Sequence, residues 1–337
     1  MTRVPPQPDR ILSERLFGAL ADGEFHSGEE LAQGLGVSRS AIWKAAHKLR
    51  ELGSTLHAVR NRGYRLAGAG DPLNADLIRD GIARGVRTRV RRLEVAWTVV
   101  STNTVLLERG APPLGECDVA LAEFQSAGRG RRGRTWLAPP GGAVCLSLSW
   151  TFAQVPRDVG SLSLAIGVCV LRALRRLCVP ELHLKWPNDV LLGDAKLGGI
   201  LIELRGEASG PACVVIGIGL NVALGAALTT QISATGLAAA DLTAAGISRP
   251  DRNTIAAHVI GACVAGLLDF ERDGLRAFMD EWRRADALRG RAVTVLNGEE
   301  RTRGLARGID ASGALLVEAP QGLRKFVSGE VSVRPIA

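Results

Sequence analysis

A run rich in arginine and glycine separates two apolar stretches near the middle of the chain. Residues 128–134 read Gly-Arg-Gly-Arg-Arg-Gly-Arg, and residues 117–124 and 143–150 on either side are typical of buried strands. Alone, such a run fits a solvated or nucleic-acid-binding tract. Its apolar neighbours instead predict a loop within a folded sheet. Glycines let a backbone approach a ligand and guanidiniums bind carboxylate or phosphate oxygens, so we expect this loop to close over an anion.

Length and composition predict a globular chain of two or three domains. The chain has 337 residues, of which 46% are apolar and 23% charged. Its longest apolar stretches, 162–171 and 255–268, are shorter than the roughly 20 residues that span a bilayer. The first residues lack the apolar core of a signal peptide. We therefore expect a cytoplasmic protein without a membrane partner.

The cysteines and histidines do not predict a metal site or disulfides. Six cysteines lie scattered in apolar surroundings without a Cys-x-x-Cys pair, and the five histidines are equally dispersed. We expect all six cysteines to be buried and reduced.

Positive charge is concentrated near the N-terminus. The net charge is +8, and residues 38–66 contain seven basic residues against the single acid Glu51. This distribution predicts a polyanionic partner for that segment.

Residues 1–68 have the pattern of a winged helix-turn-helix. Apolar spacing predicts a helix over 9–20, Ser27 with Glu30 forms a capping box for a second helix, and Ser38 caps a third that reaches Leu52. Residues 55–66 alternate around a turn and predict a basic hairpin. This order resembles the DNA-binding domains of bacterial repressors.

The exposed face of the third helix and the hairpin would contact DNA. The predicted DNA-binding residues are Arg39, Ser40, Trp43, Lys44, His47, Arg60 and Arg62. The alternative is a three-helix unit that serves only dimerisation or scaffolding.

The rest of the chain predicts an α+β domain over 69–286 and a small β-barrel over 287–337. Strands and helices are mixed in the middle domain without the regular alternation of a Rossmann fold, which favours a mainly antiparallel sheet. Residues 225–246 are rich in alanine, threonine and glycine and predict a mobile loop. Five short alternating segments follow residue 289.

Four blocks together identify a family. They are Ser-Thr-Asn at 101–103, the loop 125–136, Lys-Trp-Pro-Asn-Asp at 185–189 with Lys-Leu-Gly-Gly at 196–199, and Gly-Ile-Gly-Leu-Asn at 217–221. In this order, behind a winged helix, they resemble bifunctional biotin protein ligases that also repress the biotin operon. The resemblance extends from about residue 23 to residue 310. It implies a catalytic domain like that of class II aminoacyl-tRNA synthetases and biotin ligases, and an SH3-like C-terminal barrel.

The resemblance also implies the reaction and its partners. Such ligases join the carboxylate of biotin to the α-phosphate of ATP, release pyrophosphate, and pass the biotinyl group to a lysine of a biotin carboxyl carrier protein. Mg²⁺ is expected with ATP, held by phosphates and water. A homodimer carrying the adenylate would bind operator DNA.

Site residues follow from the same resemblance. Ser101, Thr102, Asn103 and Gln125 would hold biotin, and Arg129, Gly130 and Arg131 would fold over biotin and phosphate. Lys196, one of only five lysines, would bridge carboxylate and phosphate, with Gly199 beside it. The predicted catalytic residues are Lys196, Arg131 and Asp189. The predicted nucleotide-binding residues are Arg131, Arg132, Trp136, Asn188, Lys196 and Asn221.

Asp189 would orient or deprotonate the incoming lysine of the carrier, because an ammonium is not nucleophilic. The alternative is a structural aspartate that caps the turn after Pro187.

One departure from the family concerns adenine. Repressor-type relatives carry an aromatic residue after the Gly-x-Gly-x-Asn strand, whereas 225–246 contains none, which leaves Leu237, Leu242 or an alanine to cover the base.

Two other functions fit parts of the pattern. One is a winged-helix regulator that senses a small carboxylate without catalysis, and the other is a lipoate-type ligase.

Overall fold

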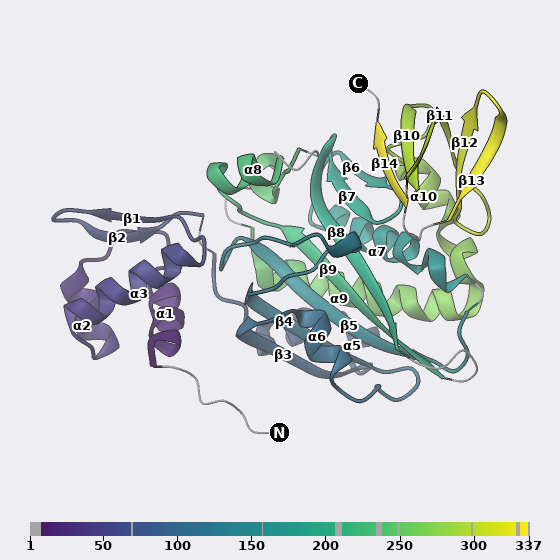
Figure 1. The fold of residues 1–337 in the computed structure, drawn as a ribbon. Coiled ribbons are helices and arrows are strands. Elements are labelled where there is room, and N and C mark those ends of the chain that lie inside the picture. The colour runs from purple at the N-terminus through teal and green to yellow at the C-terminus, as the bar shows by residue number, and fades with distance from the viewer. Residues whose placement is uncertain are drawn as a thin grey trace.

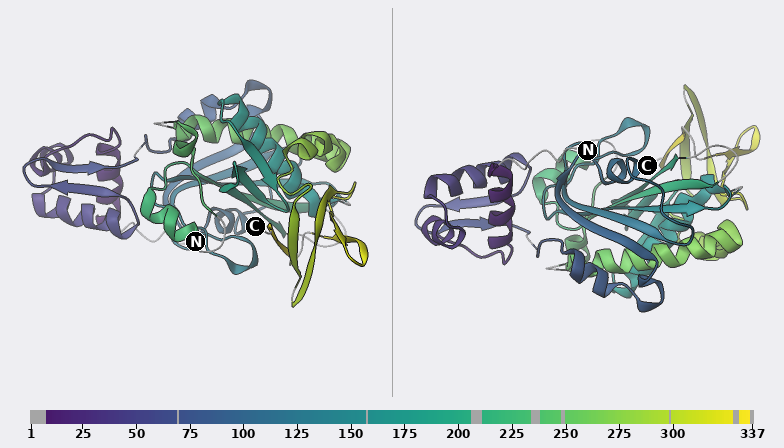
Figure 2. Two further views of the ribbon diagram at one scale, coloured as in Figure 1. Left: turned by 90° about the horizontal axis from the view of Figure 1, so that it is seen from above. Right: turned by 90° about the horizontal axis from the view of Figure 1, so that it is seen from below.

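The computed structural model describes residues 8–68, 70–156, 158–205, 211–233, 238–247, 250–297, 299–327 and 331–335. The chain forms an N-terminal helical lobe, a central sheet with helices, and a C-terminal set of strands beyond the sheet (Figure 1). Two further views show the N-terminal lobe at one end of the molecule, next to the central sheet (Figure 2).

The N-terminal lobe is the predicted winged helix-turn-helix. Its elements are α1 Pro8–Ala19, α2 Gly28–Leu35, α3 Arg39–Glu51, β1 Leu56–Val59 and β2 Gly63–Leu66. Ser27 and Glu30 form the predicted capping box, α2 ends at Gly36 with φ 66°, and Ser38 caps α3. Apolar residues of all three helices and both strands form a core of their own, including Phe17 and Ile42.

A seven-stranded sheet forms the centre of the molecule. In spatial order its strands are β3 Val90–Val99, β4 Cys117–Gln125, β5 Ala143–Phe152, β9 Ala212–Asn221, β8 Ala195–Arg205, β7 Asp189–Leu192 and β6 Leu182–Lys185. Only the β3–β4 pair is parallel among these neighbours. The prediction of a mainly antiparallel sheet is confirmed.

Helices cover one face of this sheet. The long helices α7 Leu162–Arg176 and α9 Arg252–Asp273 pack on each other and on the strands, and their apolar side chains join one large core with β4, β5 and β9. Shorter helices surround them: α4 Ala75–Gly81, α5 Arg84–Arg87 and α10 Met279–Ala285. Residues 252–285 are long and apolar enough to cross a membrane, but 61% of their most apolar stretch is buried inside the protein. The apolar character of this segment is explained by the core that it helps to fill.

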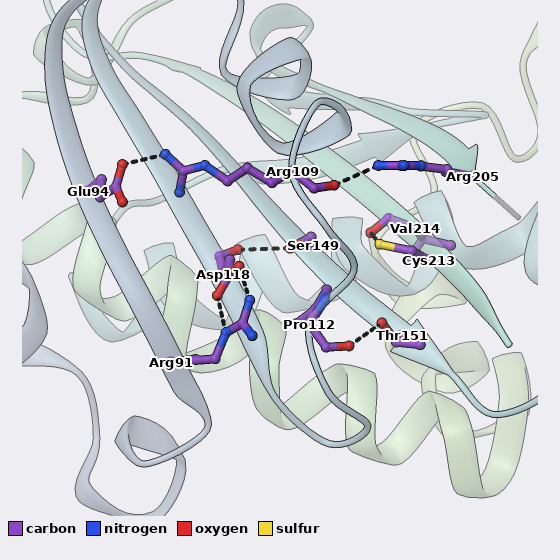
Figure 3. A network of polar contacts seen from close by, with 10 residues as sticks. All are labelled: Arg91, Glu94, Arg109, Pro112, Asp118, Ser149, Thr151, Arg205, Cys213 and Val214. Atoms are coloured by element: carbon purple, nitrogen blue, oxygen red, sulfur yellow. Dashed lines mark hydrogen bonds and ion pairs between the residues drawn. The ribbon is translucent and has the colours of Figure 1, made fainter. Parts of the chain in front are cut away.

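The opposite face of the sheet is more polar. The short helix α6 Thr102–Leu107 packs there against β4, β5 and β9. Beside it, Arg91 binds the buried Asp118, and Thr151 Oγ1 donates to the carbonyl of Pro112 over 2.6 Å (Figure 3). Glu94 of β3 pairs with Arg109 in the same region. The Thr151–Pro112 and Glu94–Arg109 contacts hold the segment after α6 against the sheet.

The C-terminal strands form an antiparallel sheet in the order β13-β12-β11-β10-β14. Their bounds are β10 Ala292–Asn297, β11 Glu300–Ile309, β12 Leu315–Ala319, β13 Gly322–Phe326 and β14 Val331–Pro335. The indole of Trp186 donates to the carbonyl of Gly313 over 3.0 Å, which ties this sheet to the central one. The five predicted strands are confirmed.

Two expectations need correction. Residues 225–246 are not one loop, because α8 Ala226–Ser233 and a short 3-10 helix, Leu242–Ala245, lie within them. Two alanines and a leucine at the start of α8 favour helix over the loop that weak periodicity suggested. Cys178 is exposed just after α7, whereas the other five cysteines are buried as predicted.

Candidate active site

A cavity on the polar face of the sheet brings together residues from all four sequence blocks. It lies among α6, the loop after β4, the turn between β6 and β7, and the strands β8 and β9. Of the predicted ligand-binding residues it is lined by Ser101, Thr102, Asn103, Gln125, Arg129, Gly130, Arg131, Trp136, Asn188, Asp189, Lys196, Gly199 and Asn221. Segments more than a hundred residues apart in sequence thus form one site.

The first side of the cavity is a cluster of hydrogen-bonding groups without charge. Gln125 Oε1 accepts from the backbone N–H of Thr102 at 2.8 Å and from its hydroxyl at 3.2 Å. Ser147 Oγ of β5 lies 2.7 Å from Thr102 Oγ1 and 2.5 Å from Asn103 Oδ1. Thr102, Asn103 and Ser147 are all buried. Such groups can bind a polar, uncharged ring that both donates and accepts.

Two glycines of β9 make room for this arrangement. A Cβ at Gly217 would lie 2.3 Å from Asn103 Oδ1, and one at Gly219 would lie 2.5 Å from the indole of Trp136. The side chains of Asn103 and Trp136 therefore lie directly against the backbone of β9. The Gly-x-Gly pattern, which is weak evidence in a sequence, has a steric reason here.

The second side of the cavity carries charge. Lys196 Nζ donates to Asp189 Oδ1 at 2.6 Å, and both side chains are largely buried. Arg131 Nη1 donates to Asn188 Oδ1 at 3.2 Å, while Asn188 Nδ2 donates to the carbonyl of Ile200 at 2.9 Å. A cation on β8, a cation on the loop and a carboxylate on β7 thus meet at one point. This arrangement can neutralise two anions that must approach each other.

The arginine loop folds back on itself over the cavity. Gly130 N–H donates to the carbonyl of Arg134 at 2.7 Å, and Trp136 N–H donates to that of Gly128 at 2.8 Å. Burial, together with the neighbouring arginines, lowers the pKa of the Arg131 guanidinium, while Asp189 opposes this shift. Arg132 is exposed, has φ 58° and does not line the cavity, whereas Arg134 does.

A third part of the cavity suits a flat heterocycle. Asn221 is buried and donates through Nδ2 to the carbonyls of Lys196 and Ala240, but its Oδ1 has no hydrogen-bond partner. Trp136 and Ile232 of α8 line the same cavity. Leu242 is instead buried in the main core, and Leu237 lies outside the described residues.

Several lining or supporting residues escaped prediction from the sequence. Ser147 and Ile232 belong to no motif, and Glu203, which pairs with Arg129 at 3.1 Å, lies outside the four sequence blocks. A signal for Glu203 existed, because strand alternation places it on the same side of β8 as Gly199 and Leu201. Among the described residues, no group of three or more His, Cys, Asp or Glu side chains is arranged to hold a metal ion.

The predicted DNA-contacting residues lie on one unit. Arg39, Ser40, Trp43, Lys44 and His47 are exposed on α3, and Trp43 stacks on His47 with ring centroids 5.7 Å apart. Arg60 and Arg62 are exposed around the turn of the hairpin, where Arg62 lies 4.2 Å from the ring centroid of Phe25.

Comparison with family models matches three segments. Residues 16–65 match an HTH domain, 96–221 match the biotin/lipoate A/B protein ligase family, and 289–334 match the biotin protein ligase C-terminal domain. The order of these matches follows the helical lobe, the central sheet and the C-terminal sheet.

Individual relatives agree with this assignment. The bifunctional ligase/repressor BirA of Escherichia coli is 39% identical over 97% of this chain and 98% of its own length, and that of Bacillus subtilis is 30% identical over 93% and 95%. The biotin protein ligase of Aquifex aeolicus, solved in complex with biotin and ATP, has a TM-score of 0.62 and 27% identity, covering 73% of this chain and 100% of its own. The chain therefore belongs to the family of bifunctional biotin protein ligases and repressors.

Proposed function

We propose that the cavity binds biotin and ATP side by side and catalyses the formation of biotinyl-5′-AMP. A carboxylate oxygen of biotin attacks the α-phosphorus, a P–O bond forms, and the bond to pyrophosphate breaks. The contact that carries this proposal is Lys196 Nζ to Asp189 Oδ1 at 2.6 Å, within reach of the loop that carries Arg131. When both substrates bind, Lys196 would contact the carboxylate and the phosphate and reduce their repulsion.

The uncharged cluster would hold the ureido ring of biotin. Ser101, Thr102, Asn103 and Gln125 supply both donors and acceptors, which a ureido group with two N–H groups and one carbonyl requires. Arg129, Gly130 and Arg131 would cover biotin and exclude water from the mixed anhydride, with Gly199 leaving space beside Lys196.

The nucleotide would occupy the part of the cavity near Asn221. The unpartnered Oδ1 of Asn221 can accept from the amino group of adenine. Trp136 and Ile232 can pack on the base in place of the aromatic residue that 225–246 lacks. Arg131, Asn188 and Lys196 would contact the phosphates, whereas the exposed Arg132 reaches them only if the loop moves. Mg²⁺ would arrive with ATP and be held by phosphate and water oxygens.

In the second step, a carrier lysine would take up the biotinyl group. Its neutral amine attacks the acyl carbon, a C–N bond forms, and AMP leaves as the proton passes to a base. Asp189 is the candidate for that base, since it is a carboxylate in the lining of the cavity beside Lys196. The partner would be a biotin carboxyl carrier protein, and the reaction would take place in the cytoplasm.

The test is exchange of labelled pyrophosphate into ATP by the purified full-length protein, with biotin, with lipoate and with neither. Exchange that depends on biotin alone supports the proposal. Exchange with lipoate would favour a lipoate-type ligase, and no exchange by folded protein would favour a sensor without catalysis.

The N-terminal unit would bind operator DNA as part of a homodimer that carries the adenylate. The exposed side chains of α3 and the basic hairpin carry this proposal. In this proposal the unit at 1–68 binds DNA, the unit at 69–286 catalyses ligation, and the unit at 287–337 supports the active site. Sedimentation with and without biotin and ATP tests dimerisation, and a gel-shift titration tests DNA binding. An unchanged mass distribution would contradict the dimer.

A further inference from the structure

We propose that Glu203 is a positioning residue that links the biotin-binding cluster to the arginine loop. The inference rests on the proposed function, since it concerns how that same cavity holds its acid substrate. Glu203 lies near the end of β8 and does not itself line the cavity. It acts through two residues that do, Asn103 and Arg129.

One carboxylate oxygen of Glu203 receives both contacts. Asn103 Nδ2 donates to Glu203 Oε2 at 2.7 Å, and Arg129 Nη2 donates to the same atom at 3.1 Å. Arg129 Nη2 also donates to Thr104 Oγ1 at 3.2 Å. The side chain of Glu203 is 26% exposed and that of Arg129 is 44% exposed, so solvent screens this ion pair only in part.

Glu203 determines which way the amide of Asn103 points. Its carboxylate and the carbonyl of Leu201 are both acceptors, so they bind the Nδ2 side of the amide. Asn103 Oδ1 then faces the hydroxyl of Ser147, 2.5 Å away. A neutral amide at position 203 could donate as well as accept, and the amide of Asn103 would no longer have one preferred orientation.

A continuous chain of hydrogen bonds follows from this orientation. It runs from Arg129 through Glu203, Asn103 and Ser147 to the hydroxyl of Thr102, whose backbone N–H donates to Gln125. The arginine loop and the uncharged cluster of the cavity are thereby joined through one carboxylate. A ligand that orders the uncharged cluster also favours the closed loop, and removal of the carboxylate should weaken ligand binding and loop closure together.

The test uses Glu203→Gln in the full-length protein, with Glu94→Gln as the matched control. Glu94 also pairs with an arginine, Arg109 (Figure 3), and is not among the residues that line the cavity. We expect Glu203→Gln to weaken biotin binding, measured by calorimetry without ATP, by about ten-fold, as loss of a charge-assisted hydrogen bond does. In pyrophosphate exchange, KM for biotin should rise far more than kcat falls.

Loop closure gives a second readout. Trypsin cuts after arginine, and the loop contains four of them. At saturating biotin, Glu203→Gln should be cleaved there faster than the wild type and the Glu94→Gln control. Glu203→Asp, which keeps the charge, should recover part of both effects. In an Arg129→Met background, Glu203→Gln should weaken biotin binding by a smaller factor than it does in the wild-type background, because the shared contact is already absent.

Three results would overturn the inference: biotin affinity unchanged in Glu203→Gln, an equal loss in Glu94→Gln, or full additivity with Arg129→Met. Failure of the proposed function is a different result, since the wild-type protein itself would then not bind biotin.

Discussion

The N-terminal helical lobe and the central sheet place their functional residues in opposite ways. In the lobe, the residues predicted to contact DNA follow one another on α3 and the adjoining hairpin, and local caps define α2 and α3. In the central domain, the cavity draws on α6, the loop after β4, and strands β7, β8 and β9. A function on one exposed helix depends on local sequence, whereas a function in a cavity depends on packing between distant segments.

The two regions are nevertheless in contact. Phe17 of α1 is fully buried and lies 5.4 Å, between ring centroids, from Trp97 of β3. A Cβ at Gly141 would lie 3.0 Å from the same phenylalanine ring. Substitutions in the lobe and in the cavity should therefore affect different functions, and by different amounts.

The largest effect should come from Lys196→Ala. Loss of the cation that neutralises carboxylate and phosphate should reduce biotin-dependent pyrophosphate exchange by about 10²–10³-fold. The control is Lys325→Ala, a lysine 65% exposed in the C-terminal sheet, which should leave exchange unchanged. Near-normal exchange by Lys196→Ala would remove Lys196 from the catalytic residues.

A single methyl group in the sheet should also matter. In Gly219→Ala the added Cβ would lie 2.5 Å from the indole of Trp136, so the ring must move. We expect a loss of about 1–3 kcal/mol in the free energy of unfolding, measured in urea, and weaker nucleotide binding. A Gly34→Ala variant, where a Cβ meets nothing within 4 Å, serves as the control. If both variants behave alike, packing around Trp136 is not tight.

On α3, loss of a side chain should affect DNA binding alone. Lys44 is exposed, and Lys44→Ala should weaken binding to all DNA sequences and reduce the magnitude of the salt-dependence slope by about one. Exchange activity and the unfolding midpoint should stay at wild-type values. Filter binding over a series of salt concentrations measures the slope. An unchanged slope would show that Lys44 does not meet a phosphate.

The smallest effect concerns Asp286, next to the C-terminal sheet. Burial raises the pKa of its carboxyl, although backbone N–H groups of Leu288 and Arg289 oppose this. The folded state thus binds this proton more tightly than the unfolded state, and that stabilisation is lost as pH rises through the raised pKa. Asp286→Asn removes this titration. The free energy of unfolding of the variant minus that of the wild type should therefore be larger at about pH 7 than at about pH 4. Asp280→Asn, an 82% exposed aspartate, should show no such gain.

Much of the fold followed from local patterns. The capping box of Ser27 and Glu30, the cap at Ser38 and the alternation of the last fifty residues predicted elements that the structure contains, because caps and side-chain alternation are determined within a few residues. Residues 225–246 were predicted wrongly, since α8 has weak periodicity and the segment's alanine, threonine and glycine content suggested a loop.

Sequence alone determined which chemistry is present: a loop of arginines and glycines, a lysine on one strand, a carboxylate on another, and a family to which these blocks belong. Tertiary structure decided how they meet. It put Arg134 and not Arg132 at the cavity, placed Asn103 and Trp136 on the bare backbone of Gly217 and Gly219, and brought Glu203 to Arg129. The reason is physical, because these contacts join residues dozens of positions apart, and only the register of the strands and the packing across the sheet determine such distances.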